Sequence, residues 1–375
     1  MKTKYSMVKE YILSKILDGT FKPNQKISSE SEYMKQFNVS RHTVRLAIGD
    51  LVSQGYLYRE QGAGTFCADR KNIMNSASVV NQKNIAIMTT YISDYIFPSI
   101  IRGAESVLSQ QGYQVSLFST NNDHEKEKQF LQQILTQHFD GVIIEPTRSS
   151  ISNPNINYYL SLEKSQIPYI MINSYYDELE PLSLTMDDEA GGYKQTEHLI
   201  NLGHKNIIGL FKTDDIQGNK RMKGYLKAHR KNNLTIDPTN IITYFTNEKG
   251  TKPLTELSRL LDNSTEERPT AIVCYNDELA IKLLDVLRER NISVPHDMSI
   301  VGYDDSFLAK VSEVKLTTIA HPLSEMGSKA AEMILSLVKG NKPLTRKNES
   351  IVYEPELIIR NSTISINKQE EEMPI

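Results

Sequence analysis

Residues 26–66, KISSESEYMKQFNVSRHTVRLAIGDLVSQGYLYREQGAGTF, decide the fold of the N-terminal part of the chain. Ser29 and Glu32 have the spacing of a capping box, in which each side chain accepts a hydrogen bond from a backbone N–H at the start of a helix. Ser40 is an N-cap residue for a longer helix, and Gly55 is expected to cap its end because glycine readily adopts left-handed backbone conformations. The stretch therefore predicts two consecutive helices joined by a turn.

A further helix and a hairpin flank these two helices. Residues 5–18 place apolar side chains on one side of a helix. Residues 56–60 and 65–68 are predicted to form two short strands around the glycine-containing segment 61–64. Three helices followed by a hairpin have the order of a winged helix-turn-helix, which we assign to residues 1–70.

The helix after Ser40 has an apolar side and a basic side. Its apolar residues follow the i, i+3, i+4, i+7 spacing of a packed helix face, and they are Val44, Ala47, Ile48 and Leu51. Arg41, His42 and Arg45 project elsewhere, where guanidinium groups can reach guanine edges or phosphates in a major groove. An isolated arginine pair is more often an ordinary solvated face, but the surrounding helices and wing favour DNA recognition.

The charge distribution agrees with a nucleic-acid partner for the head. Residues 1–70 contain 11 Lys and Arg against 7 Asp and Glu, although the whole chain has a net charge of −3. Basic charge confined to one segment suits a polyanion. Gly62 and Gly64 at the wing tip would let the backbone approach a groove, although a plain hairpin turn explains these glycines equally well. The residues predicted to contact double-stranded operator DNA are Lys4, Glu30, Arg41, His42, Thr43, Arg45, Gln61 and Gly62.

From residue 83 onward the pattern changes to alternating strands and helices. Short apolar runs such as IAIMT, GVIIEP, NIIGLF and MSIVGYDD are separated by helical segments such as FPSIIRGAESVLSQQG and NDELAIKLLDVLRERN. This alternation predicts a doubly wound α/β body with parallel sheets and two lobes over residues 83–366. We expect residues 71–82 to be a linker and residues 367–375 to be a charged tail.

The composition points to a soluble protein of the cytoplasm. No apolar run approaches the roughly 18 residues of a membrane span, and the first residues lack the apolar centre of a signal peptide. Cys67 and Cys274 lie far apart without metal-ligand spacing, so we expect neither a disulfide framework nor a metal site. These features argue against an exported sugar-binding protein and against a membrane partner.

Polar residues that follow the apolar runs are candidates for a ligand site in the body. In parallel sheets the binding crevice lies beyond the carboxyl ends of the strands. Carboxylates, amides and an arginine there suit a ligand with many hydroxyl groups, and tyrosine rings can cover its C–H face. Each Asn or Asp could equally be a helix cap. The candidates on this rule are Tyr91, Asp94, Tyr95, Glu145, Arg148, Asn173, Asn276, Asp277 and Asp304, and all of them except Asp277 are predicted to contact the effector.

Two classes of function remain open on the residues alone. One is a ligand-released transcription repressor, and the other is an α/β sugar-processing enzyme with an accessory DNA-binding head. The sequence contains no GxSxG, P-loop, strand-linked GxGxxG or HExxH motif. This favours the repressor and requires no cofactor.

The head and the body each resemble a known family. Residues 26–66 are similar to the DNA-binding domain of GntR-family repressors, with SSE and TFC where that family has PSE and TFV. CYNDELA, MSIVGYDD and LTTIAHPLSEMG resemble motifs of LacI/GalR repressors and periplasmic sugar-binding proteins. The combination, together with YISDYIFPSIIRG and VYEPELIIR, resembles the arabinose-responsive repressors of Gram-positive bacteria.

The resemblance implies a periplasmic-binding-protein-like body, a monosaccharide effector that is most consistent with L-arabinose, and a homodimer that reads two operator half-sites. It also implies which residues contact the effector. The family's pocket pattern falls on Asn173, Arg221, Asn276, Asp304 and His321, where His321 replaces the glutamine common at that position.

Overall fold

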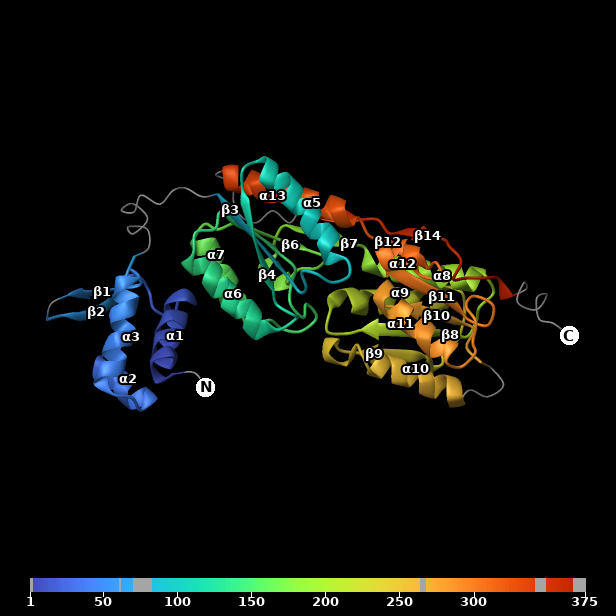
Figure 1. The fold of residues 1–375 in the computed structure, drawn as a ribbon, viewed down its shortest axis with the longest axis horizontal. Coiled ribbons are helices and arrows are strands. Elements are labelled where there is room, and N and C mark those ends of the chain that lie inside the picture. The colour runs from blue at the N-terminus through green and yellow to red at the C-terminus, as the bar shows by residue number, and fades with distance from the viewer. Residues whose placement is uncertain (1–2, 61, 70–82, 264–267, 341–348, 367–375) are drawn as a thin grey trace. The chain divides into compact units, whose positions relative to one another are not determined.

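The computed structural model describes residues 3–60, 62–69, 83–263, 268–340 and 349–366. The predicted linker, the predicted tail and Gln61 therefore lie outside the described residues. The internal contacts divide the chain into two compact units (Figure 1). The first unit comprises Met1–Asn84, Glu127–Asp140 and Pro154–Ile167, and the second comprises Ile85–Lys126, Gly141–Asn153 and Pro168–Ile375.

The predicted winged helix-turn-helix is confirmed in the first unit. Its elements are α1 (Lys4–Leu17), α2 (Glu30–Phe37), α3 (Arg41–Ser53), β1 (Leu57–Glu60) and β2 (Gly64–Cys67). β1 and β2 pair antiparallel and form the wing. The capping box of Ser29 and Glu32 is complete, and Ser40 caps α3 as predicted. Gln54 is the C-cap of α3, and Gly55 follows it with a left-handed φ of 74°, so the glycine ends the helix as predicted.

The apolar face of α3 forms the centre of the head. Val44, Ala47, Ile48 and Leu51 are at most 1% exposed, and Val8 and Ile12 of α1 are fully buried with them. Tyr33 of α2 completes the core at 1% exposure. Because the core occupies this side of α3, the opposite side remains open to solvent.

The first unit also contains most of α6 (His124–Thr136) and all of α7 (Ile156–Lys164). Buried Glu127 of α6 accepts hydrogen bonds from the Asn155 amide at 2.7 Å and from the Tyr159 hydroxyl at 2.8 Å. These bonds satisfy a carboxylate that would otherwise be costly to bury.

The first sheet of the body has the strand order β13-β7-β6-β5-β3-β4. These strands are β13 (Ile351–Tyr353), β7 (Ser183–Met186), β6 (Tyr169–Ile172), β5 (Gly141–Ile144), β3 (Asn84–Thr89) and β4 (Gln114–Ser119). α5 (Phe97–Gln110) and α13 (Leu323–Lys339) pack together on this sheet. Gly103 of α5 and Gly327 of α13 allow this close approach, because a Cβ at either position would collide with the backbone of the other helix.

The second sheet has the order β14-β12-β11-β10-β8-β9. Its strands are β14 (Glu356–Ile358), β12 (Thr317–Ala320), β11 (Ser299–Asp304), β10 (Ala271–Cys274), β8 (Ile207–Lys212) and β9 (Ile241–Tyr244). β14 pairs antiparallel with β12, whereas the other pairs are parallel.

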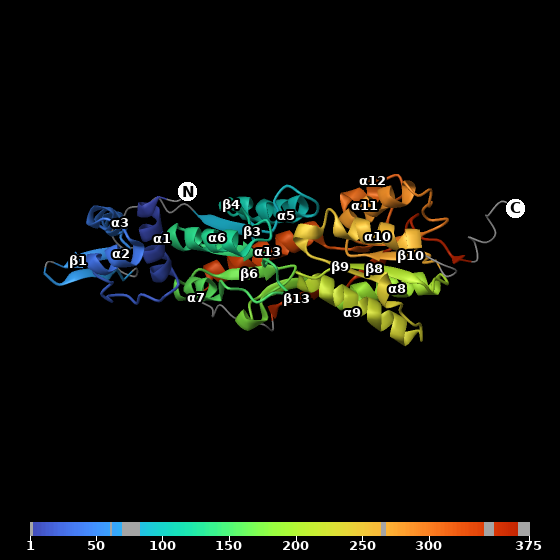
Figure 2. The same cartoon turned by 90° about the horizontal axis from the view of Figure 1, so that it is seen from below.

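Helices cover both faces of the second sheet, as Figure 2 shows. α8 (Asp188–Asn201) and α9 (Ile216–Lys231) lie on one face, and α10 (Lys252–Asn263) and α11 (Asp277–Arg288) lie on the other. Alternate residues of β8 serve the two faces, since Ile208 packs with α11 residues and Ile207 packs with α8 and α9 residues. The predicted doubly wound α/β class is therefore confirmed. The remaining elements are α12 (Phe307–Val311) and the 3-10 turns Asp177–Leu179, Pro238–Asn240 and Thr246–Glu248.

The two sheets define two lobes of the second unit, and the chain passes between the lobes after β7, after β12 and after β13. These strands lie at one side of the strand orders, opposite to β4 and β9. Within the residues that the structure describes, no helix is long and apolar enough to cross a membrane.

Candidate functional sites

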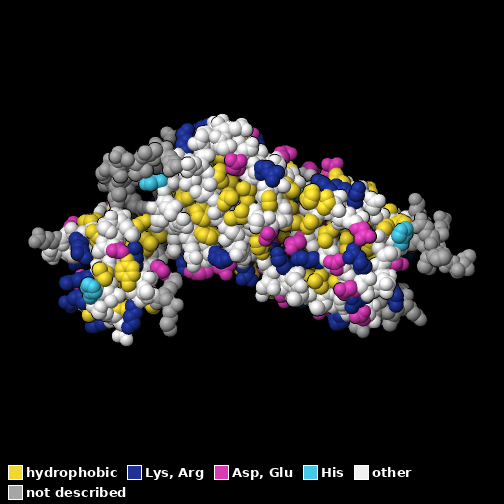
Figure 3. Space-filling model, in the orientation of Figure 1, with side chains coloured by type: hydrophobic (Ala, Val, Ile, Leu, Met, Phe, Trp, Pro, Cys, Tyr) yellow, Lys and Arg dark blue, Asp and Glu magenta, His cyan; other side chains and the backbone are white. Residues whose placement is uncertain are grey.

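The outer side of α3 is exposed and basic. Arg41, His42 and Arg45 are exposed, and the first turn of α3 carries no acidic residue, whereas α2 begins with Glu30. The positive end of a helix dipole favours anions, so basic residues there are unfavourable unless an anion joins them. Figure 3 shows Lys and Arg side chains gathered on this part of the head, with a histidine beside them. This surface suits phosphate groups.

The other predicted DNA contacts have different surroundings. Arg45 Nε donates to Glu30 Oε2 at 2.9 Å, and both side chains remain partly exposed. Lys4 is exposed, and its Nζ donates to the Asn38 carbonyl at 3.5 Å. The Thr43 N–H donates to Ser40 Oγ, so this residue helps to form the N-cap. Gly62 is exposed at the wing with a φ of 79°.

A polar cavity of about 980 Å³, including its open mouth, lies between the carboxyl ends of the two sheets. Nine of the ten predicted effector contacts line it, and they are Tyr91, Asp94, Tyr95, Glu145, Asn173, Arg221, Asn276, Asp304 and His321. The strand-end rule therefore brings side chains from separate strands to one cavity. It missed several other lining residues, among them Asp188, Lys212, Asp215 and Tyr275.

Arg221 of α9 is the most firmly held of these side chains. Its Nε donates to Asp188 Oδ1 at 2.8 Å and its Nη1 donates to the Tyr275 carbonyl at 2.7 Å. The guanidinium carbon also lies 3.4 Å from the centre of the Tyr303 ring, within the range of a cation–π contact. Burial disfavours the charge of Arg221, but Asp188, Tyr303, Asp304 and Tyr275 together outweigh this effect, so the pKa of Arg221 is raised and the group stays charged.

Asp304 links Arg221 to Tyr95 of the other lobe. Its Oδ1 lies 3.8 Å from Arg221 Nη2, and its Oδ2 accepts a hydrogen bond from the Tyr95 hydroxyl at 2.7 Å. The Tyr95 hydroxyl also accepts the Asp277 N–H at 3.1 Å. Burial raises the pKa of Asp304, and Arg221 lowers it in part. Tyr95 is therefore a bridge between the lobes as well as a wall of the cavity.

Asp277 lies behind the cavity at the start of α11. Its carboxylate accepts hydrogen bonds from Thr318 Oγ1 at 2.7 Å and from the Ser306 N–H at 2.8 Å. Burial and the neighbouring charge of Asp304 raise the pKa of Asp277 to about 7. Asn276 caps the same helix by accepting a hydrogen bond from the Leu279 N–H. It is therefore both a helix cap and a residue of the cavity lining.

Glu145 and Asn173 form the polar wall contributed by the first lobe. Glu145 accepts hydrogen bonds from the Thr90 N–H and hydroxyl and from Asn173 Nδ2, all between 2.6 and 2.9 Å. Burial raises the pKa of Glu145, and the Thr90 bonds oppose this rise. Asn173 Oδ1 is buried without a hydrogen-bond partner in the described part of the chain. That oxygen can accept a hydroxyl from a ligand.

Lys212, Asp215 and Tyr275 form a charged group in the cavity lining. Lys212 Nζ lies 2.6 Å from Asp215 Oδ2, and that oxygen also accepts the Tyr275 hydroxyl at 3.0 Å. Burial lowers the pKa of Lys212, but Asp215 and Asp214 outweigh it and raise the pKa overall. Lys212 directly follows the apolar run NIIGLF and Asp215 comes three residues later, so the strand-end rule could have found both.

His321 lies at the passage between β12 and α13. Burial, reinforced by the charge of Arg221, lowers the pKa of His321 to about 4. Its Nδ1 is buried and has no hydrogen-bond partner among the described residues. The ring is therefore neutral at physiological pH and offers a further polar contact to a ligand.

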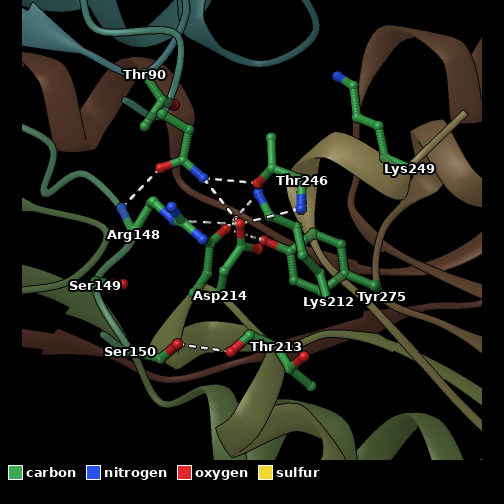
Figure 4. Close-up of polar contacts among 12 residues, drawn as sticks. Thr90, Arg148, Ser149, Ser150, Lys212, Thr213, Asp214, Thr246, Lys249 and Tyr275 are labelled. Carbon is green, nitrogen blue, oxygen red and sulfur yellow. Dashed lines mark hydrogen bonds and ion pairs between the residues drawn. The ribbon is translucent and has the colours of Figure 1, made fainter. Parts of the chain in front are cut away.

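Arg148 is the predicted effector contact that the structure does not bring to the cavity. Its backbone has a φ of 46°, its N–H donates to Asn122 Oδ1 at 2.7 Å, and its Nε lies 3.9 Å from Asp214 Oδ2 (Figure 4). The residue follows β5, as the rule requires, but the left-handed turn directs it to a neighbouring cluster. No group of three or more metal-ligating side chains occurs within the described ranges.

The arrangement can bind a small polyhydroxylated molecule. Carboxylates of both lobes can accept hydrogen bonds from hydroxyl groups, and Arg221 and Lys212 can donate to them. Tyr91 and Phe97 supply aromatic faces. A ligand held by both lobes would favour the conformation in which the lobes lie together.

Comparison with known proteins assigns both parts of the chain. Residues 4–67 match the family of bacterial regulatory proteins of the gntR family, and residues 196–363 match the periplasmic binding protein-like domain. The chain is 60% identical over 365 residues to an arabinose metabolism transcriptional repressor of Halalkalibacterium halodurans, with 97% of each chain covered. It is 50% identical to a repressor of the same name from Geobacillus stearothermophilus, over 97% of this chain and 98% of that one.

A solved structure gives the same fold with a ligand. The LacI family transcriptional regulator from Enterococcus faecium with bound ribose has a TM-score of 0.65 and 26% identity, and the match covers 76% of this chain and 100% of that chain.

Proposed function

This chain belongs to the arabinose metabolism transcriptional repressors, which are regulators and not enzymes, and from that premise we propose that L-arabinose binds the inter-lobe cavity and releases the protein from operator DNA. The choice of arabinose as the sugar is based on the names of the two relatives. The chemistry of the cavity supports a sugar, because its lining combines carboxylates, amides, cations and aromatic rings.

The observation that carries the proposal is the position of Arg221. Its guanidinium is fixed by Asp188 and by the carbonyl of Tyr275, so its remaining N–H groups have a set direction in the cavity lining. A preorganised cation of this kind loses little conformational entropy when a ligand binds. Arg221 and Asp304 on one lobe and Glu145 on the other then contact one ligand.

The head would hold the operator through α3. We propose that Arg41, His42 and Arg45 contact the major groove, and that Lys4, Thr43, Gln61 and Gly62 support this contact. Glu30 would act by holding Arg45 through their ion pair. We also propose that the protein works in the cytoplasm as a homodimer, since helix-turn-helix repressors commonly read two half-sites through their own two-fold symmetry. Light scattering of the purified protein tests the dimer.

A calorimetric titration of the full chain tests the effector. L-arabinose, D-xylose, D-ribose and D-galactose are titrated separately, and we expect L-arabinose to bind at least tenfold more tightly than the others. Asp304→Asn is the matched variant, because it removes a carboxylate charge at the cavity and should weaken binding of L-arabinose. Equal binding of all four sugars, or binding of none, would contradict L-arabinose as the effector.

A further inference from the structure

A second group of polar side chains joins the two lobes outside the sugar cavity. Asn122 and Arg148 follow β4 and β5 of the first sheet, and Asp214 and Thr246 follow β8 and β9 of the second sheet. Of these four residues, none lines the cavity described above. We refer to them together as the inter-lobe latch (Figure 4).

Asn122 lies at the centre of the inter-lobe latch. Its Nδ2 donates to Thr246 Oγ1 at 2.6 Å and lies 3.5 Å from Asp214 Oδ2, so one amide reaches two residues of the other lobe. Its Oδ1 accepts the Arg148 N–H at 2.7 Å. The Thr246 N–H donates to Asp214 Oδ2 at 3.0 Å. Asn122 is 6% exposed and Asp214 is 1% exposed, so these contacts are shielded from water.

The residues that follow Arg148 add contacts between the lobes. Ser150 Oγ donates to the Thr213 carbonyl at 2.6 Å. Ser149 Oγ accepts the N–H of Ile216, the first residue of α9, at 3.0 Å. The side chain of the N-cap residue Asp215 accepts no hydrogen bond from the helix start. The first lobe therefore satisfies the N-terminus of the helix that carries Arg221.

The inter-lobe latch lies far from the segments that connect the lobes, so its contacts depend strongly on lobe closure. The chain passes between the lobes beside β7, β12, β13 and β14, whereas β4 and β9 are the outermost strands on the opposite side of their sheets. Asn122 follows β4 and Thr246 follows β9. Contacts far from the connecting segments break first when the lobes separate and form last when they close.

The inter-lobe latch is also incompletely satisfied. Asp214 Oδ1 and Arg148 Nε are buried without hydrogen-bond partners within the part of the chain that the structure describes. The ion pair between Arg148 Nε and the other carboxylate oxygen, Asp214 Oδ2, is long at 3.9 Å. Unsatisfied buried polar groups reduce the net gain from the contacts that are made, so the closed arrangement is favoured only modestly.

We propose that the inter-lobe latch sets the balance between open and closed lobes, and thereby the sugar concentration at which the repressor responds, without contacting the sugar. The proposal rests on the proposed function, because it assumes that sugar binds the closed lobes more tightly. A ligand that binds only the closed state has an apparent dissociation constant equal to its intrinsic value divided by the fraction of closed protein. Asn122 and Asp214 are then positioning residues of the sugar response.

Two adjacent asparagines allow a matched test. Asn122 and Asn121 have φ values of 56° and 50°, which glycine adopts readily, so either can be replaced by glycine without backbone strain. Asn122→Gly removes the inter-lobe amide. Asn121→Gly is the control, because Asn121 is exposed and its side chain accepts a hydrogen bond from Ser119 of its own lobe. Thr246→Val, which removes the hydroxyl that accepts from Asn122, gives a second independent variant.

Hydrogen exchange measures the inter-lobe latch without any sugar. The N–H of Ser150 donates to the Asp214 carbonyl and that of Ile216 donates to Ser149, so both amides report contact between the lobes. We expect peptides containing these amides to exchange about tenfold faster in Asn122→Gly and Thr246→Val than in Asn121→Gly and the unmodified chain. Calorimetry with L-arabinose should give an affinity about tenfold weaker in the same two variants, as expected for one or two lost hydrogen bonds.

The two measurements test the inter-lobe latch, its role in the sugar response and the proposed effector separately. Unchanged exchange in Asn122→Gly, or an equal change in Asn121→Gly, would overturn the inter-lobe latch. Faster exchange with unchanged sugar affinity would overturn its role in the response. If no form of the chain binds L-arabinose, the proposed effector is wrong, and the exchange rates still decide whether the four residues hold the lobes together.

Discussion

Arg45 and Arg221 show how the head and the body use the same residue type in different ways. The Arg45 side chain is 61% exposed and shares its charge with Glu30 across a solvated surface. The Arg221 side chain is 5% exposed, pairs with the 3% exposed Asp188 and stacks on Tyr303. An exposed charge acts through a field that salt screens, whereas a buried charge acts through fixed geometry and leaves its partners uncompensated when it is removed.

The largest expected difference comes from removing Arg221. Arg221→Ala should lower the free energy of unfolding of the body by about 3–5 kcal/mol, because it leaves Asp188 buried without its cation. It should also abolish the sugar response. Urea denaturation followed by circular dichroism measures the loss, and the double variant with Asp188→Asn should recover part of it. A loss below about 1 kcal/mol would mean that Arg221 behaves like a surface arginine.

The pH dependence of stability separates the body from the head in another way. The folded pKa of Asp277 is about 7, above its ordinary value of 3.8, so the folded protein binds a proton that the unfolded chain has released between these values. The free energy of unfolding should therefore fall as pH rises from about 4 to about 7, by up to about 4 kcal/mol from this group.

Asp277→Asn keeps the shape of the side chain and removes this titration. Urea midpoints measured at pH 5 and pH 8 should differ less in the variant than in the unmodified chain. Identical pH dependence in both would show that Asp277 does not titrate in this range. His321 has the opposite sign, because its lowered pKa makes the folded state release a proton, so the comparison uses the difference between the two chains.

The exposed arginines should have a smaller effect that is confined to DNA binding. Arg41→Ala or Arg45→Ala should weaken operator binding by about 1–3 kcal/mol and leave the sugar affinity unchanged. Fluorescence anisotropy with a labelled duplex selected from a random pool measures the change at one fixed salt concentration. Raising the salt should weaken operator binding but not sugar binding. Unchanged operator affinity in both variants would remove α3 as the recognition helix.

The wing should give the smallest effect. Gly62 has a φ of 79° and open space around the position of a Cβ, so Gly62→Ala introduces backbone strain of about 1–2 kcal/mol and no collision. Thermal unfolding should show a small loss confined to the head, with weakened operator binding. A simultaneous loss of sugar binding would point to a wider folding defect.

The head was predictable from sequence because its signals are local. The capping box of Ser29 and Glu32, the N-cap Ser40 and the spacing of the apolar face of α3 lie within a few residues of the elements that they specify. Gly55 also ends α3 as predicted, because it adopts a left-handed φ of 74° and its N–H donates to the Val52 carbonyl at 3.0 Å.

The body was predictable where a strand formed an apolar run. Glu145 and Asn173 were found because β5 and β6 are fully buried runs. The sequence does not single out β7, β9, β12, β13 and β14, because Ser, Thr, Tyr or Glu interrupts each of these short strands. Asp188 was missed because it follows β7.

Two arginines mark the limit of the strand-end rule. Arg148 obeys the rule and still turns to the inter-lobe latch, because the sequence does not reveal its left-handed backbone. Arg221 lies in the interior of α9, so no strand-end signal identifies it, and only the family resemblance pointed to it.

The central claim is that sugar bound between the lobes releases the head from DNA. Titration of L-arabinose into the complex of the full chain with a labelled operator duplex, followed by anisotropy, tests it most directly. We expect L-arabinose to release the DNA in a saturable way, and we expect Asp304→Asn to bind the same duplex equally well but to require at least tenfold more sugar. Complete retention of the DNA at saturating L-arabinose, or release at the same sugar concentration in both proteins, would contradict it.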